Sequence, residues 1–127
     1  MRIGLDTNAY TDAARGEARA VEVLRRAREI WLPFVVIGEL RAGFASGVAG
    51  RRNEAHLARF LSTGSVHIAW ADEGTTHLHA RLFSDLRVQG TPIPTNDLWI
   101  AALALQHDLV LFTRDKHFSR LPQLARL

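Results

Sequence analysis

The chain has 127 residues, 47% of them hydrophobic and 23% charged, and its formal net charge is +3. This composition is that of a globular protein with one core, and no apolar run reaches the roughly 18 residues of a membrane span, so we expect one domain over residues 1–127. The start of the chain lacks the apolar core of a signal peptide, which favours the cytoplasm, and the absence of cysteine excludes thiolate metal sites.

The first half of the chain alternates short apolar segments with helical patterns. A strand over residues 2–5 ends at Asp6, and Thr7 and Asn8 lie at the turn into a short helical segment. Residues 17–28 carry an apolar stripe with helical spacing. The elements predicted next are a strand over residues 30–34, a helix over 36–44, a break over 43–50 and a helix over 51–61.

The second half begins with a strand predicted over residues 66–70. Asp72 is expected to cap a helix over residues 73–89, which Gly90 ends. The following helix takes Thr95 or Asn96 as its N-cap and has Asp97 in its first turn. Its residues 98–105 are all apolar, so we expect it to be buried on every side. Residues 109–112 form an apolar, central strand, and residues 121–127 could add a short edge strand.

Strands that alternate with helices favour a parallel sheet with helices on both faces. The predicted fold is therefore α/β, a three-layer α/β/α sandwich with a mainly parallel sheet of four or five strands. Trp31, Trp70 and Trp99 lie in apolar runs, which places them in the core rather than on base-stacking platforms.

Four acidic residues occupy comparable places in this fold. Asp6 and Asp115 each follow a strand, Asp97 begins a buried helix, and Glu39 lies in an apolar helical window. Ligands of an open parallel sheet bind beyond the carboxyl ends of its strands, so we expect these carboxylates to converge there. Their repulsion would raise their pKa values, and a divalent cation would relieve it. Oxygen ligands without cysteine favour Mg²⁺ or Mn²⁺, an ion class that suits phosphodiester hydrolysis.

Each of these residues also has a purely structural explanation. Acids are frequent in first helical turns, which accounts for Asp97, and Glu39 could reach solvent or pair with Arg41. Thr113 and Asn8 lie two residues from an acid, where a hydroxyl or amide could orient a carboxylate or a metal-bound water. Such residues also bond to nearby backbone in turns, so both readings of them stay open.

The residues around the acids resemble those of PIN-domain ribonucleases, and more narrowly the VapC toxins of bacterial and archaeal toxin–antitoxin pairs. The motifs that carry the resemblance follow in order along the chain: Leu5-Asp6-Thr7-Asn8, Gly38-Glu39-Leu40 with Gly43, Asn96-Asp97 with Ile100-Ala101-Ala102, and Thr113-Arg114-Asp115 with His117-Phe118.

This resemblance implies a PIN-like domain that acts as a metal-dependent RNA endonuclease and hydrolyses phosphodiester bonds by metal-activated water. It implies a Mg²⁺ or Mn²⁺ site formed by Asp6, Glu39, Asp97 and Asp115. Thr113 matches a position where the family often carries Ser or Thr, and Asn8 matches a polar position of the first motif. The family also implies a homodimer and a small VapB-like antitoxin that blocks the site, often with an arginine of its own.

Other functions remain compatible with the sequence. A DNA-directed nuclease would use the same acids, and a non-catalytic binding module would use them to hold basic segments of a partner protein. All basic residues except Lys116 are arginine, which suits phosphate binding, although a GC-rich genome explains the same bias. Arg41 and Arg114 are candidates for binding RNA phosphates, and His117 is either an RNA contact or a surface turn residue. The dimer interface could use residues 17–28 or residues 43–61.

Overall fold

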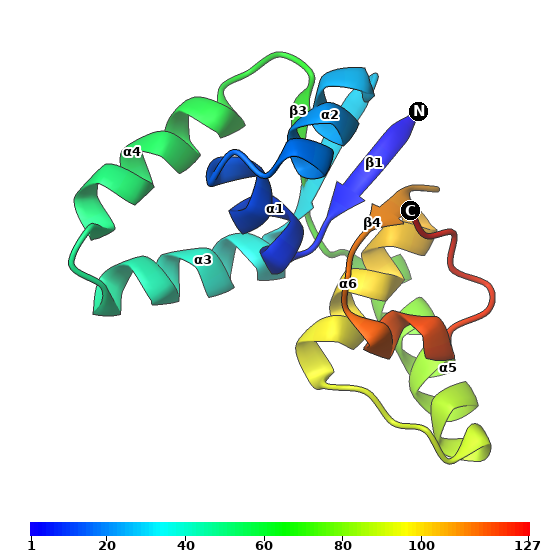
Figure 1. Cartoon of the computed structure of the whole chain (residues 1–127). Coiled ribbons are helices and arrows are strands. Elements are labelled where there is room, and N and C mark those ends of the chain that lie inside the picture. Colours follow the sequence, from blue (N-terminus) through cyan, green and yellow to red (C-terminus); the bar gives the residue numbers. More distant parts are fainter.

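The computed structural model describes residues 1–127 and places a parallel four-stranded sheet between two layers of helices (Figure 1). The strands lie side by side in the order β3-β2-β1-β4. Their bounds are Arg2–Leu5 for β1, Glu29–Pro33 for β2, Val66–Ala69 for β3 and Val110–Phe112 for β4. The predicted α/β/α sandwich is therefore confirmed, with four strands in its sheet.

Helices α1 to α4 lie on one side of the sheet, and α5, α6 and the short helix η1 lie on the other (Figure 1). The helices of the first layer are α1 (Thr7–Ala14), α2 (Ala18–Arg26), α3 (Phe34–Ser46) and α4 (Gly50–Leu61). Those of the second layer are α5 (Glu73–Gln89), α6 (Thr95–Gln106) and the 3₁₀ helix η1 (Lys116–Arg120).

The strand order reverses between β1 and β4. Strand β1 pairs with β2 on one side and with β4 on the other, and Leu5 lies opposite Phe112 in the second pairing. Because the two strands are parallel, the residues that follow them leave the sheet at the same edge, so Asp6 and Thr113 emerge as neighbours. Such a switch point is where open parallel sheets bind their ligands.

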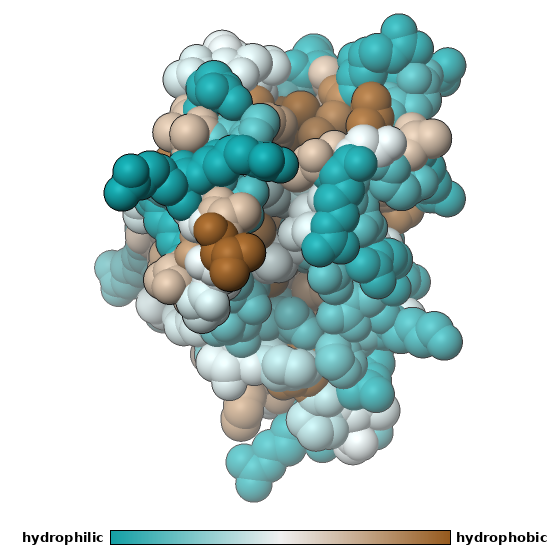
Figure 2. Space-filling model, turned by 60° about the vertical axis from the view of Figure 1, so that its left-hand side comes forward, coloured by the Kyte–Doolittle hydropathy of each residue, from teal (hydrophilic) through white to brown (hydrophobic).

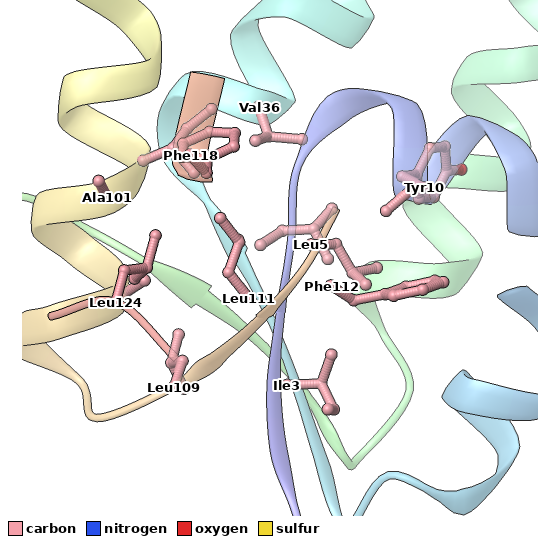
Figure 3. Packing of buried hydrophobic residues seen from close by; sticks show 14 of the residues in the cluster. Ile3, Leu5, Tyr10, Val36, Ala101, Leu109, Leu111, Phe112, Phe118 and Leu124 are labelled. Atoms are coloured by element: carbon pink, nitrogen blue, oxygen red, sulfur yellow. The ribbon is translucent and has the colours of Figure 1, made fainter. Parts of the chain in front are cut away.

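A cluster of 26 buried hydrophobic residues fills the space on both faces of the sheet. Figure 3 shows how β4 contributes to each face: Leu111 points to the α6 side with Phe118 and Leu124, while Phe112 points the opposite way, towards Tyr10. Helix α6 buries residue after residue along its length, as its apolar sequence predicted. The buried α6 and β4 thus hold Asp97 and the residues after Phe112 on rigid elements.

Several helix ends follow the sequence signals. Asp72 caps α5 through a capping box with Thr75, and Gly90 ends that helix with a φ of 77°. The left-handed conformation of Gly90 costs little because glycine has no Cβ. The predicted edge strand near the C-terminus is reduced to a single parallel bridge between Leu111 and Arg126.

Two helix starts differ from the prediction. Helix α6 begins at Thr95, with Pro94 as its N-cap and no side-chain cap, so neither Thr95 nor Asn96 is the N-cap. Helix α3 begins at Phe34 rather than at residue 36, again directly after a proline that closes the preceding strand. In both places, proline in an extended conformation supplies the transition into the helix; for α6 the prediction had assigned it to a polar side chain, and for α3 no cap was predicted.

The surface is mainly hydrophilic on the face drawn in Figure 2, where brown appears only in separate small patches. None of the helices combines the length and apolar composition that crossing a membrane would require. The core assignment of Trp70 is wrong, because this residue is 65% exposed and stacks on Phe34 at a centroid distance of 6.2 Å. Trp70 follows β3, an edge strand with a neighbour on one side only, so its apolar sequence context does not bury it.

Candidate metal centre

Three of the four predicted acids line one open cavity of about 510 Å³ at the carboxyl edge of the sheet. Glu39 comes from α3, Asp97 from the first turn of α6, and Asp115 from the segment after β4. None of the seven lining residues is hydrophobic. The fold thus gathers acids from distant parts of the chain around one solvent-filled space.

The fourth predicted acid, Asp6, is not among the residues that line this cavity and is only 4% exposed. It is the N-cap of α1, and its Oδ1 accepts a hydrogen bond of 2.9 Å from the backbone N–H of Ala9. An N-cap acid is an ordinary way to start a helix, but here the cap is buried beside other carboxylates. The local helix start therefore fixes the position of Asp6.

The hydroxyl of Thr113 connects Asp6 to Asp115. It donates a hydrogen bond to Oδ2 of Asp6 and accepts one of 2.9 Å from the backbone N–H of Asp115. The residues on either side of the strand-order switch are thereby linked through a single side chain. These contacts agree with both readings of Thr113, because its hydroxyl holds the carboxylate of Asp6 and also bonds to the backbone of its own turn.

His117 lies between two of the acids, which the sequence did not predict. Its Nδ1 is 3.1 Å from Oδ2 of Asp97 and 3.1 Å from Oδ1 of Asp115, and its backbone N–H donates to Asp115 at 2.9 Å. One ligand atom from each of Asp97, Asp115 and His117 lies within 4.8 Å of the others, so these three residues could hold a metal ion. The only sequence signal was the position of His117 two residues after Asp115.

Burial and neighbouring charge both act on these carboxylates. Burial is the main reason that the pKa of Asp97 is raised, the charges of Asp115 and Glu39 raise it further, and His117 opposes the rise. Burial also raises the pKa of Asp6, against the hydrogen bonds from Thr113 and Ala9 N–H, and the charge of Asp115 adds to the rise. The acids thus repel one another, as expected for carboxylates gathered at one site.

Glu39 is more exposed than the other acids and is held by a residue that the sequence analysis did not single out. The hydroxyl of Thr7 donates to Oε1 of Glu39 at 2.8 Å. Thr7 follows Asp6 directly, so the start of α1 positions two acids at once. Asn8 is exposed on the same turn, and the side chains that bond to the acids are those of Thr7, Thr113 and His117.

The two arginines predicted to bind phosphate are engaged within the chain. Arg41 pairs with Glu54 at 2.9 Å, and Arg114 pairs with Asp12 at 2.9 Å. Glu39 therefore does not have Arg41 as its partner. An RNA phosphate could take the Nε and Nη2 donors of either arginine only if that arginine left its carboxylate.

The donor chemistry of the site fits a divalent cation. It offers carboxylate oxygens and one imidazole, and the chain has no thiolate to compete for the ion. Carboxylates are the ligands that Mg²⁺ and Mn²⁺ prefer in proteins. A bound cation would also offset the repulsion that adds to the effect of burial in raising the pKa values of Asp6 and Asp97.

Comparison with known proteins agrees with this site. The family model for the PIN domain matches residues 3–124. The ribonuclease VapC2 of Rickettsia felis is 30% identical over 105 residues, which cover 82% of this chain and 77% of that protein. The ribonuclease VapC5 of Mycobacterium tuberculosis is 31% identical over 91 residues, covering 72% and 67%.

Solved structures agree as well. A chain in the crystal structure of VapBC2 from Rickettsia felis, bound to a DNA fragment from its promoter, superposes with a TM-score of 0.86 at 27% identity. The superposition covers 100% of this chain and 98% of that chain. Sequence and structure together show that the chain belongs to the PIN-domain family, within its VapC-type branch.

Proposed function

We propose that the protein is a metal-dependent RNA endonuclease and the toxin of a toxin–antitoxin pair, acting in the cytoplasm as one PIN-like domain. The observation that carries the proposal is the acidic cavity at the switch point between β1 and β4, where Asp97 and Asp115 lie with His117 in reach of one ion. The ribonuclease names of the VapC relatives support RNA as the substrate.

The proposed cofactor is Mg²⁺ or Mn²⁺, held by carboxylates from the set Asp6, Glu39, Asp97 and Asp115. When bound, such an ion would activate water for attack on a phosphodiester and stabilise the leaving oxygen. The side chains of this protein then have separate tasks. Thr113 fixes Asp6 and Asp115 relative to each other, and Thr7 fixes Glu39.

Glu39 is our candidate for the group that receives the proton of the attacking water. It lines the cavity but is not part of the close set formed by Asp97, Asp115 and His117. Its Oε1 accepts from Thr7, whereas its Oε2 has no hydrogen-bond partner within the chain. A carboxylate that is positioned but not fully engaged by a metal can act as a general base. Asn8, exposed beside Thr7, is assigned the weaker role of orienting a water at the rim.

The test is cleavage of matched RNA and DNA strands by the purified protein, with Mn²⁺ or with EDTA. We expect RNA to be cut with Mn²⁺ only, and Asp97→Asn to abolish cutting while the circular dichroism spectrum is unchanged. Asp85→Asn, which removes an exposed acid on α5 away from the cavity, is the control and should cut at the native rate. Full activity of Asp97→Asn, or cutting in EDTA, would overturn the assignment.

The same assay separates the alternatives. Faster cutting of DNA than RNA would indicate a DNA-directed nuclease. Tight partner binding without any Mn²⁺ affinity, measured by calorimetry, would indicate a non-catalytic binding module. Sequencing of RNA 5′ ends after brief expression in a host without the antitoxin would then identify the RNA that is cut.

The proposed partners are a VapB-like antitoxin that blocks the acidic cavity and a second copy of the chain in a homodimer. Support for the antitoxin comes from relatives solved as VapBC assemblies, such as VapBC-1 from nontypeable Haemophilus influenzae, which superposes with a TM-score of 0.85 at 26% identity. Addition of the cognate antitoxin should stop RNA cleavage at equimolar ratio, and sedimentation should report the oligomeric state.

A further inference from the structure

A second cavity, of about 170 Å³, lies between the C-terminal half of α5 and the start of α6. Six residues line it: Phe83, Leu86, Arg87, Pro92, Ile93 and Leu98. Four of the six are hydrophobic. Pockets for drug-sized ligands usually measure roughly 300–1,000 Å³, so this one suits a smaller, flat group. Its apolar lining with a single guanidinium favours a group that is hydrophobic on its faces and polar at its edge.

This cavity is next to the acidic one along the chain. Pro92 and Ile93 line the apolar cavity, and the residues that follow, from Pro94 to Asp97, line the acidic cavity. Asp97 is the fourth residue after Ile93, so their Cα atoms lie at most about 14 Å apart even in an extended chain. A strand of nucleic acid held at the acids can therefore reach the apolar cavity within a few nucleotides.

The surroundings of the apolar cavity carry positive charge. Arg120 donates a hydrogen bond of 2.7 Å to the carbonyl oxygen of Pro92, which fixes its guanidinium at the rim. Arg87 lines the cavity itself. The arginines that form ion pairs within the chain are Arg2, Arg25, Arg26, Arg28, Arg41 and Arg114. Arg87 is not among them, so its donors are available to a ligand.

We infer that this cavity binds one unpaired base of the RNA substrate close to the cleavage site, with guanine preferred. This inference rests on the proposed function. Phe83 lines the cavity and is 52% exposed, and an aromatic ring is a group on which a base can stack. The guanidinium of Arg87 has the donor geometry that matches O6 and N7 of guanine. Arg120 at the rim suits the phosphate of that nucleotide.

The experiment uses an RNA with a stretch of random nucleotides, the purified protein and Mn²⁺, followed by sequencing of the product 5′ ends. The native protein should enrich guanine at one position near the cut. Arg87→Gln should flatten that preference. Phe83→Ala should lower kcat/KM on the selected RNA by roughly 5- to 150-fold, the range expected for loss of one stacked base.

The control is Arg81→Gln, which makes the same charge change at another exposed position of α5, outside the cavity, and which should keep the guanine preference. Native Mn²⁺ affinity and a native circular dichroism spectrum in all three variants would exclude loss of the metal site or of the fold.

If the native protein cuts RNA and both cavity variants keep its rate and preference, the cavity inference is wrong and the proposed function stands. If the variants change only sedimentation or antitoxin binding, the cavity is a contact with another protein chain, and the inference that it binds a base is wrong. Absence of RNA cleavage by the native protein would remove the proposed function itself.

Discussion

Replacing Asp6 by asparagine separates two contributions of this side chain, its helix cap and its charge. The carboxylate is buried, caps α1 through Ala9 N–H, and has a raised pKa because of burial. Asparagine is as good an N-cap as aspartate, so its amide oxygen can keep the bond to Ala9 N–H. The substitution therefore removes the negative charge with little change to the start of the helix.

The sign of the effect on stability follows from the raised pKa. The folded protein binds the Asp6 proton more tightly than the unfolded chain does, so the free energy of unfolding falls as pH rises from the unfolded pKa, about 3.9, through the folded pKa. At neutral pH the full cost applies, about 1.4 kcal/mol for each unit by which the pKa is raised. Asp6→Asn avoids this cost but loses the oxygen that accepts from the Thr113 hydroxyl. Without metal it should therefore be more stable than the native protein where the pKa cost exceeds about 1 kcal/mol, the typical net contribution of one hydrogen bond.

The alanine variant supplies the matched comparison. Asp6→Ala also removes the charge, but it loses the cap, which costs about 0.5–2 kcal/mol. For a chain of this length that difference corresponds to roughly 2–8 °C in Tm, so the asparagine variant should melt higher than the alanine variant by that amount.

Thermal unfolding in EDTA and in excess Mn²⁺ measures both properties. The native protein should gain about 2.7 kcal/mol at a metal concentration of 100 times its Kd, whereas Asp6→Asn should lose most of that gain and all RNA cleavage. The reasoning is refuted if Asp6→Asn is less stable than Asp6→Ala in EDTA. It is also refuted if Asp6→Asn keeps native cleavage and native stabilisation by Mn²⁺.

Three further predictions concern the neighbouring residues. Mn²⁺ affinity should weaken as pH falls through the raised pKa of Asp97, because protons compete with the metal for this carboxylate. Equal affinities by calorimetry at mildly acidic and neutral pH would contradict this prediction. Thr113→Val should cost about 1–3 kcal/mol in urea unfolding, because Asp6 loses a donor and the N–H of Asp115 loses an acceptor; an unchanged midpoint would argue against the link. His117→Ala should move the pH–rate profile of cleavage to higher pH, because the imidazole lowers the pKa of Asp97; a profile that stays in place would exclude this role.

Parts of the site were predictable because they depend on strand ends. Asp6 and Asp115 each follow an apolar strand, and parallel strands place such residues at one edge of a sheet whatever the details of packing. The all-apolar sequence after Asp97 likewise fixed α6 as a buried helix with its start at that edge. For these residues, position along the chain is sufficient to locate the side chain.

The contacts of Thr7 and His117 could not be predicted in the same way. Each depends on the direction of one side chain that reaches another element far away in sequence, as with Thr7 and Glu39, which are 32 positions apart. Trp70 shows a related limit, since its apolar neighbours indicate a strand but do not show that the strand is at the edge of the sheet. Hydrophobic periodicity identifies helices and strands, but the order of the strands in the sheet decides which side chains come into contact.

The link between Asp6 and Thr113 has a consequence for how the protein is made. These two residues are 107 positions apart, and β4 must pair with β1 before their hydrogen bond can form. At translation rates of roughly 5–20 residues per second, the ribosome needs about 5–20 s to proceed from one to the other. A nascent chain with β1, β2 and β3 already paired therefore still lacks Asp97 and Asp115, so the acidic centre cannot be complete before β4 has emerged.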